Sequence, residues 1–219
     1  MGALFTSSLV LNPFFSSVNA GEHAKSGPLR LLPIDLTLIN DLPVAQHPER
    51  TKQPLGGSPP VLAYFPDDNA YNTEGDWFWV KGKSKADIVL RAAVADAGQG
   101  KYVSKKIATL TIDVRNAGVP NRVKVTAGGH TQTIDMSPGE LRQLSFAVGG
   151  GVPYHRDPQP TSYLYVMSVS TTNGYVPFLD LPCEKPGACP STDSRYLGAM
   201  IHVVPGYTDA DVSALSATK

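Results

Sequence analysis

Short segments of alternating apolar and polar residues recur along the chain from about residue 61. In the most regular one, 107–114, Ala108, Leu110, Ile112 and Val114 fall on one face and Ile107, Thr109, Thr111 and Asp113 on the other. A period of two residues is typical of a β-strand with one buried face. Similar or strand-rich patterns predict strands at 76–80, 86–94, 107–114, 122–126, 130–136, 141–148, 162–170 and 199–204.

Turn residues separate these segments at short intervals. Gly128–Gly129 is a two-residue hairpin signal, and Ser137-Pro-Gly-Glu140 has the composition of a turn. No amphipathic helical pattern of ten residues or more competes with the strands. The sequence therefore predicts an all-β fold, an antiparallel β-sandwich of immunoglobulin-like or jelly-roll type, over residues 61–206.

The remainder of the chain divides into three parts. Residues 1–20 are apolar, residues 21–60 form a Pro/Gly-rich linker with one short strand at 29–39, and residues 207–219 form a tail with a weak helical turn at 209–217. Two interpretations fit residues 1–20: the end of a membrane span that begins upstream, or an apolar segment packed on the domain. We expect the former, because the apolar residues fill the segment without period-two alternation.

Composition excludes some classes of protein and permits others. Lys and Arg total 19, equal to Asp and Glu, so the chain lacks the general positive field of a nucleic-acid-binding protein. Hydrophobic residues make up 42%, which is enough for a core. The 20 glycines and 19 prolines fit many short strands joined by turns.

The two cysteines lie close together, in the segment Cys183-Glu-Lys-Pro-Gly-Ala-Cys189. A Pro-Gly turn between them favours a small disulfide loop. Two free thiols or half of a zinc site are the alternatives, but no histidine pair at short spacing completes a zinc site. The expected disulfide favours the periplasm or the cell exterior over the cytosol. With residues 1–20 taken as the end of a membrane span, the chain is expected to be associated with a membrane there.

Several segments together resemble a known kind of domain. These are FWVKGKSKADIVL from Phe78, VPNRVKV from Val119, SPGE, NGYVP from Asn173, and STDSRYLGAMIHV from Ser191. This order looks like the C-terminal β-sandwich of bacterial multi-span, polyprenyl-phosphate-sugar-dependent membrane glycosyltransferases, which are related to protein mannosyltransferases. The resemblance implies an exported accessory domain whose partners are a lipid-linked sugar and the membrane domain of the same system. That family's catalytic carboxylates lie on the membrane domain, so no catalytic residue carries over to this chain.

The aromatic residues of 71–79 are candidates for a glycan site. Trp77 and Trp79 are two residues apart, so on a strand they share one face. With Tyr71 they offer flat apolar surface for sugar stacking, which also suits a free carbohydrate-binding or adhesion module. The competing interpretation buries both indoles and turns Phe78 outward, and on residue preferences we expect that core arrangement.

The loop before these aromatic residues is rich in oxygen ligands. Its candidate calcium ligands are Asp67, Asp68, Asn69, Glu74 and Asp76. The spacing is not that of a helix–loop–helix calcium site, and a solvated turn capped by Asx side chains is the simpler expectation.

Motifs of catalysis are scarce in this sequence. His130, His155 and His202 have the chemistry of general bases, but no G-x-S-x-G, H-E-x-x-H or phosphate-binding glycine loop accompanies them. Asp193 and Arg195 are expected to form an ion pair that fixes their loop. We therefore expect a protein without catalytic activity of its own.

Overall fold

The structure, a computed structural model, describes residues 53–55, 61–92, 94–98, 101–156, 159–180 and 191–208. The chain divides into two units, residues 1–33 and 34–219, and every described residue belongs to the second. The predicted apolar segment 1–20, the strand at 29–39, Cys183, Cys189 and the helical turn at 209–217 lie outside the described residues. Within the described ranges, no helix is long and apolar enough to cross a membrane.

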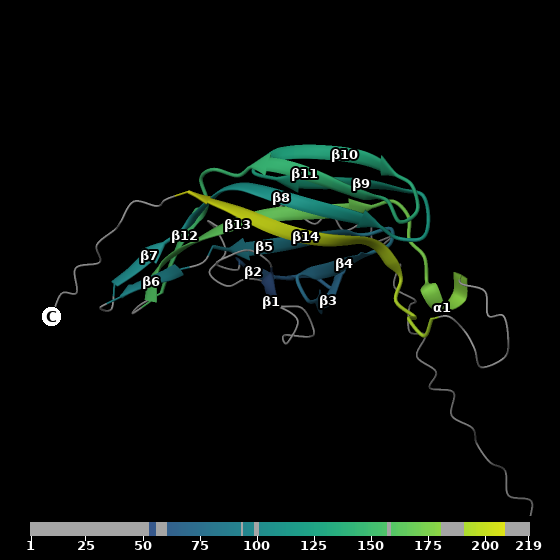
Figure 1. Cartoon of the computed structure of the whole chain (residues 1–219), viewed down its shortest axis with the longest axis horizontal. Helices are drawn as coiled ribbons and strands as arrows, with labels where there is room; N and C mark the ends of the chain where they lie inside the picture. The colour runs from purple at the N-terminus through teal and green to yellow at the C-terminus, as the bar shows by residue number, and fades with distance from the viewer. Residues whose placement is uncertain are drawn as a thin grey trace, which may run out of the picture. The chain divides into compact units, whose positions relative to one another are not determined.

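Two antiparallel sheets pack face to face (Figure 1). The seven-stranded sheet has the order β1-β2-β5-β13-β9-β10, and β12 pairs with the first part of β13. Its strands are β1 (Gln53–Leu55), β2 (Val61–Tyr64), β5 (Lys85–Arg91), β9 (Asn121–Ala127), β10 (His130–Met136), β12 (Val152–Arg156) and β13 (Gln159–Thr171).

The second sheet has the order β11-β8-β14-β4-β3. Its strands are β3 (Ala70–Glu74), β4 (Trp77–Lys81), β8 (Lys106–Asn116), β11 (Leu141–Ala147) and β14 (Leu197–Thr208). A separate hairpin joins β6 (Val94–Gly98) to β7 (Lys101–Ser104), and α1 (Pro177–Asp180) is a single helical turn. In Figure 1, α1 lies at the opposite end of the sandwich from β6 and β7.

Alternating side chains of both sheets fill the space between them. Fully buried examples are Ile88, Leu90, Val125 and Met167 from the larger sheet and Phe78, Leu110, Ile112, Ile201 and Val203 from the smaller one. Each of these strands buries one face because successive side chains of a strand point in opposite directions. Burial of these apolar side chains is the main force holding the two sheets together.

The predicted fold class is confirmed, since the chain forms an all-β sandwich of two antiparallel sheets. All eight predicted strands exist, and β10 has the predicted bounds. The assignment of faces in 107–114 is wrong at Ile107, which is buried with Leu110 rather than exposed with Thr109. A register shift between β14 and β8 at Gly206 and Tyr207 rotates Ile107 into the core.

Both predicted turns are confirmed. Gly128 and Gly129 join β9 to β10 with φ angles of 57° and 78°, the left-handed values that a tight hairpin requires. The turn at Ser137–Glu140 does not close a hairpin within one sheet. It connects β10 in the larger sheet to β11 in the smaller one. Gln132 of β10 also donates a side-chain hydrogen bond of 2.9 Å to the carbonyl of Ser145 in β11, so the two edge strands are linked across the sheets.

Candidate functional site

Trp77 and Trp79 lie on the outer face of the five-stranded sheet, the face turned away from the core. Phe78 between them is fully buried and packs on Phe65 with ring centroids 5.0 Å apart, whereas both indoles are partly exposed. The expectation that the indoles are buried and Phe78 points outward is therefore wrong. The strand has the predicted alternation, but Phe78 and Val80 supply the core contacts instead.

One row of side chains crosses this outer face in register. Glu74 of β3 lies opposite Trp77, Trp77 opposite His202, His202 opposite Asp113, and Asp113 opposite Gln143. We call these five residues the Trp77 row. Four of the five side chains are connected: the Trp77 and His202 rings stack at 5.0 Å, His202 Nδ1 lies 3.1 Å from Asp113 Oδ2, and Gln143 donates to Asp113 Oδ1 at 2.8 Å.

A second row runs beside the first. It consists of Trp79, Met200, Arg115 and Leu141, each opposite the next across β4, β14, β8 and β11. We call it the Trp79 row. Leu141 is 52% exposed, and the Arg115 guanidinium reaches over the Trp77 ring with its Cζ 5.7 Å from the centroid. The outer face therefore combines apolar surface with hydrogen-bonding groups and a cation, an arrangement typical of ligand-binding surfaces.

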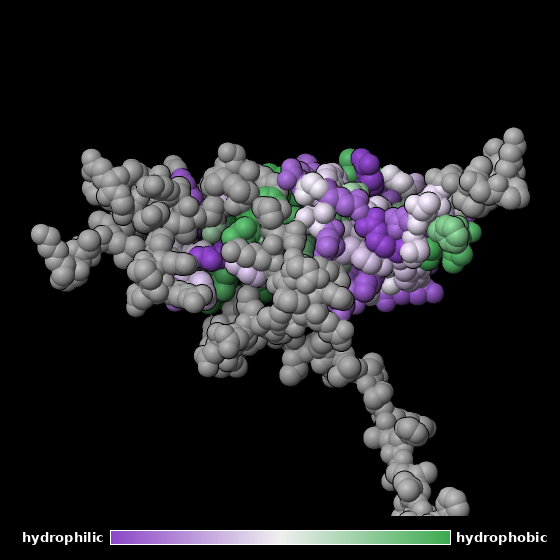
Figure 2. All heavy atoms as spheres, turned by 90° about the horizontal axis from the view of Figure 1, so that it is seen from below, coloured by the Kyte–Doolittle hydropathy of each residue, from purple (hydrophilic) through white to green (hydrophobic). Residues whose placement is uncertain are grey.

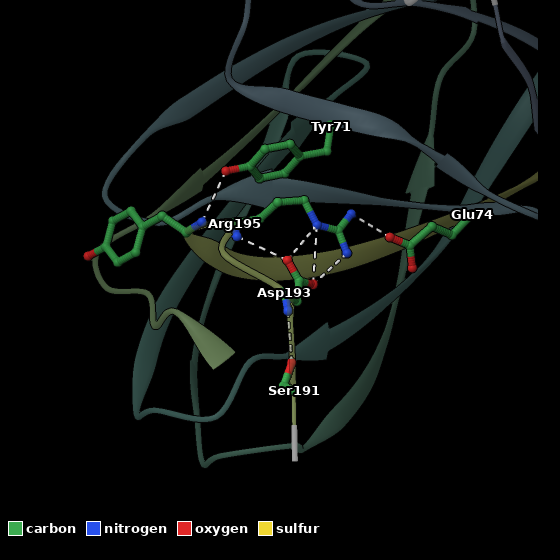
Figure 3. A network of polar contacts seen from close by, with 6 residues as sticks. Tyr71, Glu74, Ser191, Asp193 and Arg195 are labelled. Carbon is green, nitrogen blue, oxygen red and sulfur yellow. Dashed lines mark hydrogen bonds and ion pairs between the residues drawn. The ribbon is translucent and has the colours of Figure 1, made fainter. Parts of the chain in front are cut away.

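Arg195 organises the border of this face next to β3 (Figure 3). Its Nε and Nη2 donate to the two carboxylate oxygens of Asp193 at 2.9 and 2.7 Å, and its Nη1 pairs with Glu74. The Asp193 carboxylate also accepts from the Arg195 backbone N–H. The predicted ion pair is thus confirmed, and Glu74 extends it to β3. Hydrogen bonds from Arg195 hold the pKa of Asp193 below its ordinary value.

Tyr71 is part of the same network. Its ring lies beneath two cations, with Lys81 Nζ 5.3 Å and Arg195 Cζ 5.4 Å from the centroid. Its hydroxyl accepts a 3.1 Å hydrogen bond from the backbone N–H of Tyr196 (Figure 3). Tyr71 therefore anchors the loop before β14 to β3, and its ring already contacts two cations of the protein.

The five candidate calcium ligands are not brought together. Asp67 accepts hydrogen bonds from the backbone N–H groups of Asn69 and Asp87, and the Asn69 amide donates to the Lys85 carbonyl. Glu74 pairs with Arg195, which lies in the loop just before β14. Across the described ranges, no group of three or more His, Cys, Asp or Glu side chains is placed to hold a metal. Asp68 lies in the loop before β3, whereas Asp76 lies in the turn between β3 and β4.

Asp67 acts as a structural bridge from this loop to β5. Burial raises the pKa of its carboxyl, and the two backbone N–H donors partly oppose that rise. The acidic loop thus contains a capped turn of the expected Asx kind.

The three candidate histidines lie on three different strands, two in the larger sheet and one in the smaller. His130 and His155 are exposed on β10 and β12 of the larger sheet. His202 lies at the centre of the Trp77 row and pairs with the carboxylate of Asp113. The structure therefore gathers no two of them into one site.

Three of the five segments that carry the resemblance meet at the end of the sandwich near α1. Asn121, only 6% exposed, donates to the carbonyls of Asn173 and Gly198 and accepts from the N–H groups of Thr172 and Asn173. Tyr175 bridges to Leu197 by two backbone hydrogen bonds of 2.9 Å. VPNRVKV, NGYVP and DSRYLG are thus parts of one hydrogen-bonded cluster.

Two apolar side chains are exposed at this end. Phe178 is 46% and Leu179 is 73% exposed on α1. An apolar group at the corresponding end of the molecule is visible in Figure 2. The helical turn is held in place because Phe178 N–H donates to the Asp193 carbonyl and Asp180 caps the N–H of Val176, both at 2.8 Å.

A depression of about 660 Å³ lies beside the same cluster. It is lined by Pro120, Asn121, Arg122, Asp135, Met136, Ser137, Pro138, Thr172 and Asn173. Its two charged side chains bind each other, since Arg122 Nε and Nη2 donate to the carboxylate of Asp135 at 2.7 and 3.0 Å. None of its residues belongs to the outer face with the two indoles.

Comparison with protein-family models and with curated proteins finds no match to this sequence. The geometry of the outer face and the resemblance of the sequence segments are therefore the grounds on which a function is assigned.

Sequence patterns identified the two indoles and named His202 as a candidate base, but they did not place His202 beside Trp77 and they missed Asp113, Arg115 and Gln143. These neighbours come from three other strands and follow Trp77 by more than 30 residues. Alternation within each strand indicated which residues share a face, but the pairing register that brings the strands together has no local signal.

Proposed function

We propose that this protein is an exported β-sandwich that binds glycans through the outer face of its five-stranded sheet and has no catalytic activity of its own. The observation that carries the proposal is the partial exposure of Trp77 and Trp79 side by side on one strand. Exposed indoles favour sugar rings because the apolar CH face of a sugar stacks on a flat aromatic surface.

The polar neighbours of the indoles support the same ligand class. Gln143 and His202 each keep one polar atom beyond the bond to Asp113, within the Trp77 row, and Arg115 presents donors within the Trp79 row. A sugar needs both an apolar platform and oriented donors and acceptors around it.

Affinity electrophoresis in gels that contain β-glucan, mannan, galactan, polygalacturonate or alginate tests the proposal. We expect retardation of the wild-type protein by at least one polymer and its loss in Trp79→Ala. Tyr154→Ala is the matched control, because Tyr154 is 37% exposed beneath Arg91 on the other sheet. Equal migration in all gels, or equal retardation of wild type and Trp79→Ala, would overturn the proposal.

The cellular setting follows from the resemblance of the sequence segments. We propose that the domain serves a membrane glycosyltransferase system, where it holds a glycan or a lipid-linked sugar near the membrane domain. The convergence of three of those segments in one cluster, with Phe178 and Leu179 exposed beside it, supports this setting. Apolar side chains held outward on a fixed turn are suited to contact with another protein or a membrane.

Copurification from membranes tests this setting. We expect the full chain to sediment with the membrane fraction, and a larger share of Phe178→Ser/Leu179→Ser than of the wild type to be recovered in the soluble fraction. A wild-type chain that is recovered wholly in the soluble fraction would instead favour a free carbohydrate-binding or adhesion module.

A further inference from the structure

Two cations of the outer face have no acidic partner among the described residues. Lys81 follows Trp79 on β4 by two residues, and Arg115 lies in the Trp79 row on β8. Their contacts are with aromatic rings, Lys81 with Tyr71 and Arg115 with Trp77. The other nearby cation, Arg195, is neutralised by Asp193 and Glu74.

The carboxylates of the face are occupied, in contrast to these cations. Both oxygens of Asp113 are bound, one to His202 and one to Gln143, and Glu74 is bound to Arg195. Lys81 and Arg115 are therefore the charged groups of this face that can form ion pairs with a ligand. Lys81 follows Trp79 by two residues along β4, and Arg115 lies two strands away from it on β8. A ligand that stacks on this indole would meet a positive charge along the strand and another across the strands.

The face is open rather than enclosed, and it continues across the sheet. The Trp77 and Trp79 rows extend from β4 over β14 and β8 to β11, three steps that together span about 14 Å at the spacing of neighbouring strands. A surface of that length accommodates several consecutive sugar units, whereas a single sugar would cover only one indole and its neighbours.

From these three observations we infer that the ligand is an acidic linear glycan, whose uronate carboxylates pair with Lys81 and Arg115 while the chain crosses the strands over Trp79. This inference rests on the proposed glycan binding and names the class of glycan. Guanidinium and ammonium groups both bind carboxylates, Arg through two parallel hydrogen bonds and Lys as a point charge.

Calorimetry with oligogalacturonates and oligomannuronates of two to six units, and with their methyl esters, tests the inference. The free acids are expected to bind and the uncharged esters to bind at least about tenfold more weakly, because two ion pairs are lost. Affinity is expected to rise from the dimer to about the tetramer and to weaken as salt rises from 50 to 500 mM, by screening of the exposed charges.

Charge-neutral variants localise the effect. Lys81→Gln and Arg115→Gln are each expected to weaken binding of the acids about threefold to fivefold and to leave binding of the esters unchanged. Lys124→Gln and Arg91→Gln are the matched controls on the outer side of the other sheet, and they are expected to bind as the wild type does.

The outcomes separate this inference from the function on which it rests. Binding that depends on Trp79 but is equal for acids and esters overturns the acidic ligand and keeps glycan binding. Binding that is independent of Trp79, or no binding of any oligomer, overturns both. A dimer in sedimentation experiments that dissociates in Trp79→Ala would assign the face to a second copy of the chain and also overturn the inference.

Discussion

Trp77 and His202 lie directly opposite each other on β4 and β14, with their rings 5.0 Å apart and inclined by 24°. The ring separation is close to the spacing of neighbouring strands, so the two rings stand side by side on the sheet. Residues 125 positions apart in the sequence thus form one continuous surface. Since Asp113 binds the His202 ring from β8, the position of the indole depends on three strands.

Alanine substitutions along β4 are expected to cost more stability at the buried position, Phe78, than at the partly exposed positions, Trp77 and Trp79. Phe78→Ala is expected to lower the free energy of unfolding by about 3–5 kcal/mol, because it empties a fully buried site against Phe65. Trp77→Ala and Trp79→Ala, at partly exposed positions, are expected to cost about 1 kcal/mol each. Urea denaturation measures all three. Equal losses for Phe78→Ala and Trp79→Ala would contradict the arrangement of this strand.

The Asp193–Arg195 pair makes a pH-dependent contribution to stability. Because the folded pKa of Asp193 is below the ordinary value of 3.8, its contribution is present above that value and is lost as the pH falls through the lowered pKa. Asp193→Asn is expected to cost about 0.5–1 kcal/mol at pH 7, a range that allows for solvent screening of this partly exposed pair.

Thermal melts from pH 7 to pH 2 measure this effect. The difference in melting temperature between wild type and Asp193→Asn is expected to be constant down to about pH 4 and to shrink below it. Asp135→Asn is the control, because its pair with Arg122 is largely exposed and is expected to contribute less. A difference that persists unchanged at pH 2 would refute the assignment.

Gly174 lies where two loops touch. A Cβ at this position would come within 2.6 Å of the Gly82 Cα and 2.8 Å of the Leu197 carbonyl oxygen, both backbone atoms. Gly174→Ala is therefore expected to lower the free energy of unfolding by about 3 kcal/mol. Gly149→Ala, where a Cβ meets no atom within 4 Å, should change it by less than about 0.5 kcal/mol. Chemical denaturation of both variants provides the comparison.

The disulfide between Cys183 and Cys189 remains a prediction from the sequence. The expected stabilisation from closing so short a loop is about 2 kcal/mol. Mass spectrometry of non-reduced peptides, from protein produced with export to an oxidising compartment, should find the two cysteines in one linked species. Recovery of two alkylated thiols would show that the bond does not form.

Local patterns predicted much of the fold because strand formation is signalled within a few residues. The bounds of β10 match the predicted segment, and the alternation around Phe78 placed both indoles on one face. The choice of which face is buried depends on Phe65 and on the facing sheet, which no local pattern reveals. β3 was missed because Ala70–Glu74 combines one aromatic residue with turn-forming polar residues.

The site was predicted less completely than the fold. Tyr71 is engaged by Lys81, Arg195 and Tyr196, and that engagement depends on a loop more than 100 residues later in the chain. Arg115 was not singled out, since an exposed arginine on a strand has no distinguishing pattern. Its relation to Trp77 exists only because β14 lies between β8 and β4.

The place of β14 also has a consequence for how the chain folds as it is synthesised. β14 follows every other described strand in the sequence, yet it lies in the middle of the smaller sheet, paired with β8 on one side and β4 on the other (Figure 1). Until residues 197–208 leave the ribosome, β4 and β8 each have an unpaired edge beside exposed core side chains. In this state the nascent chain combines unpaired strand edges with exposed apolar side chains, the combination that favours aggregation.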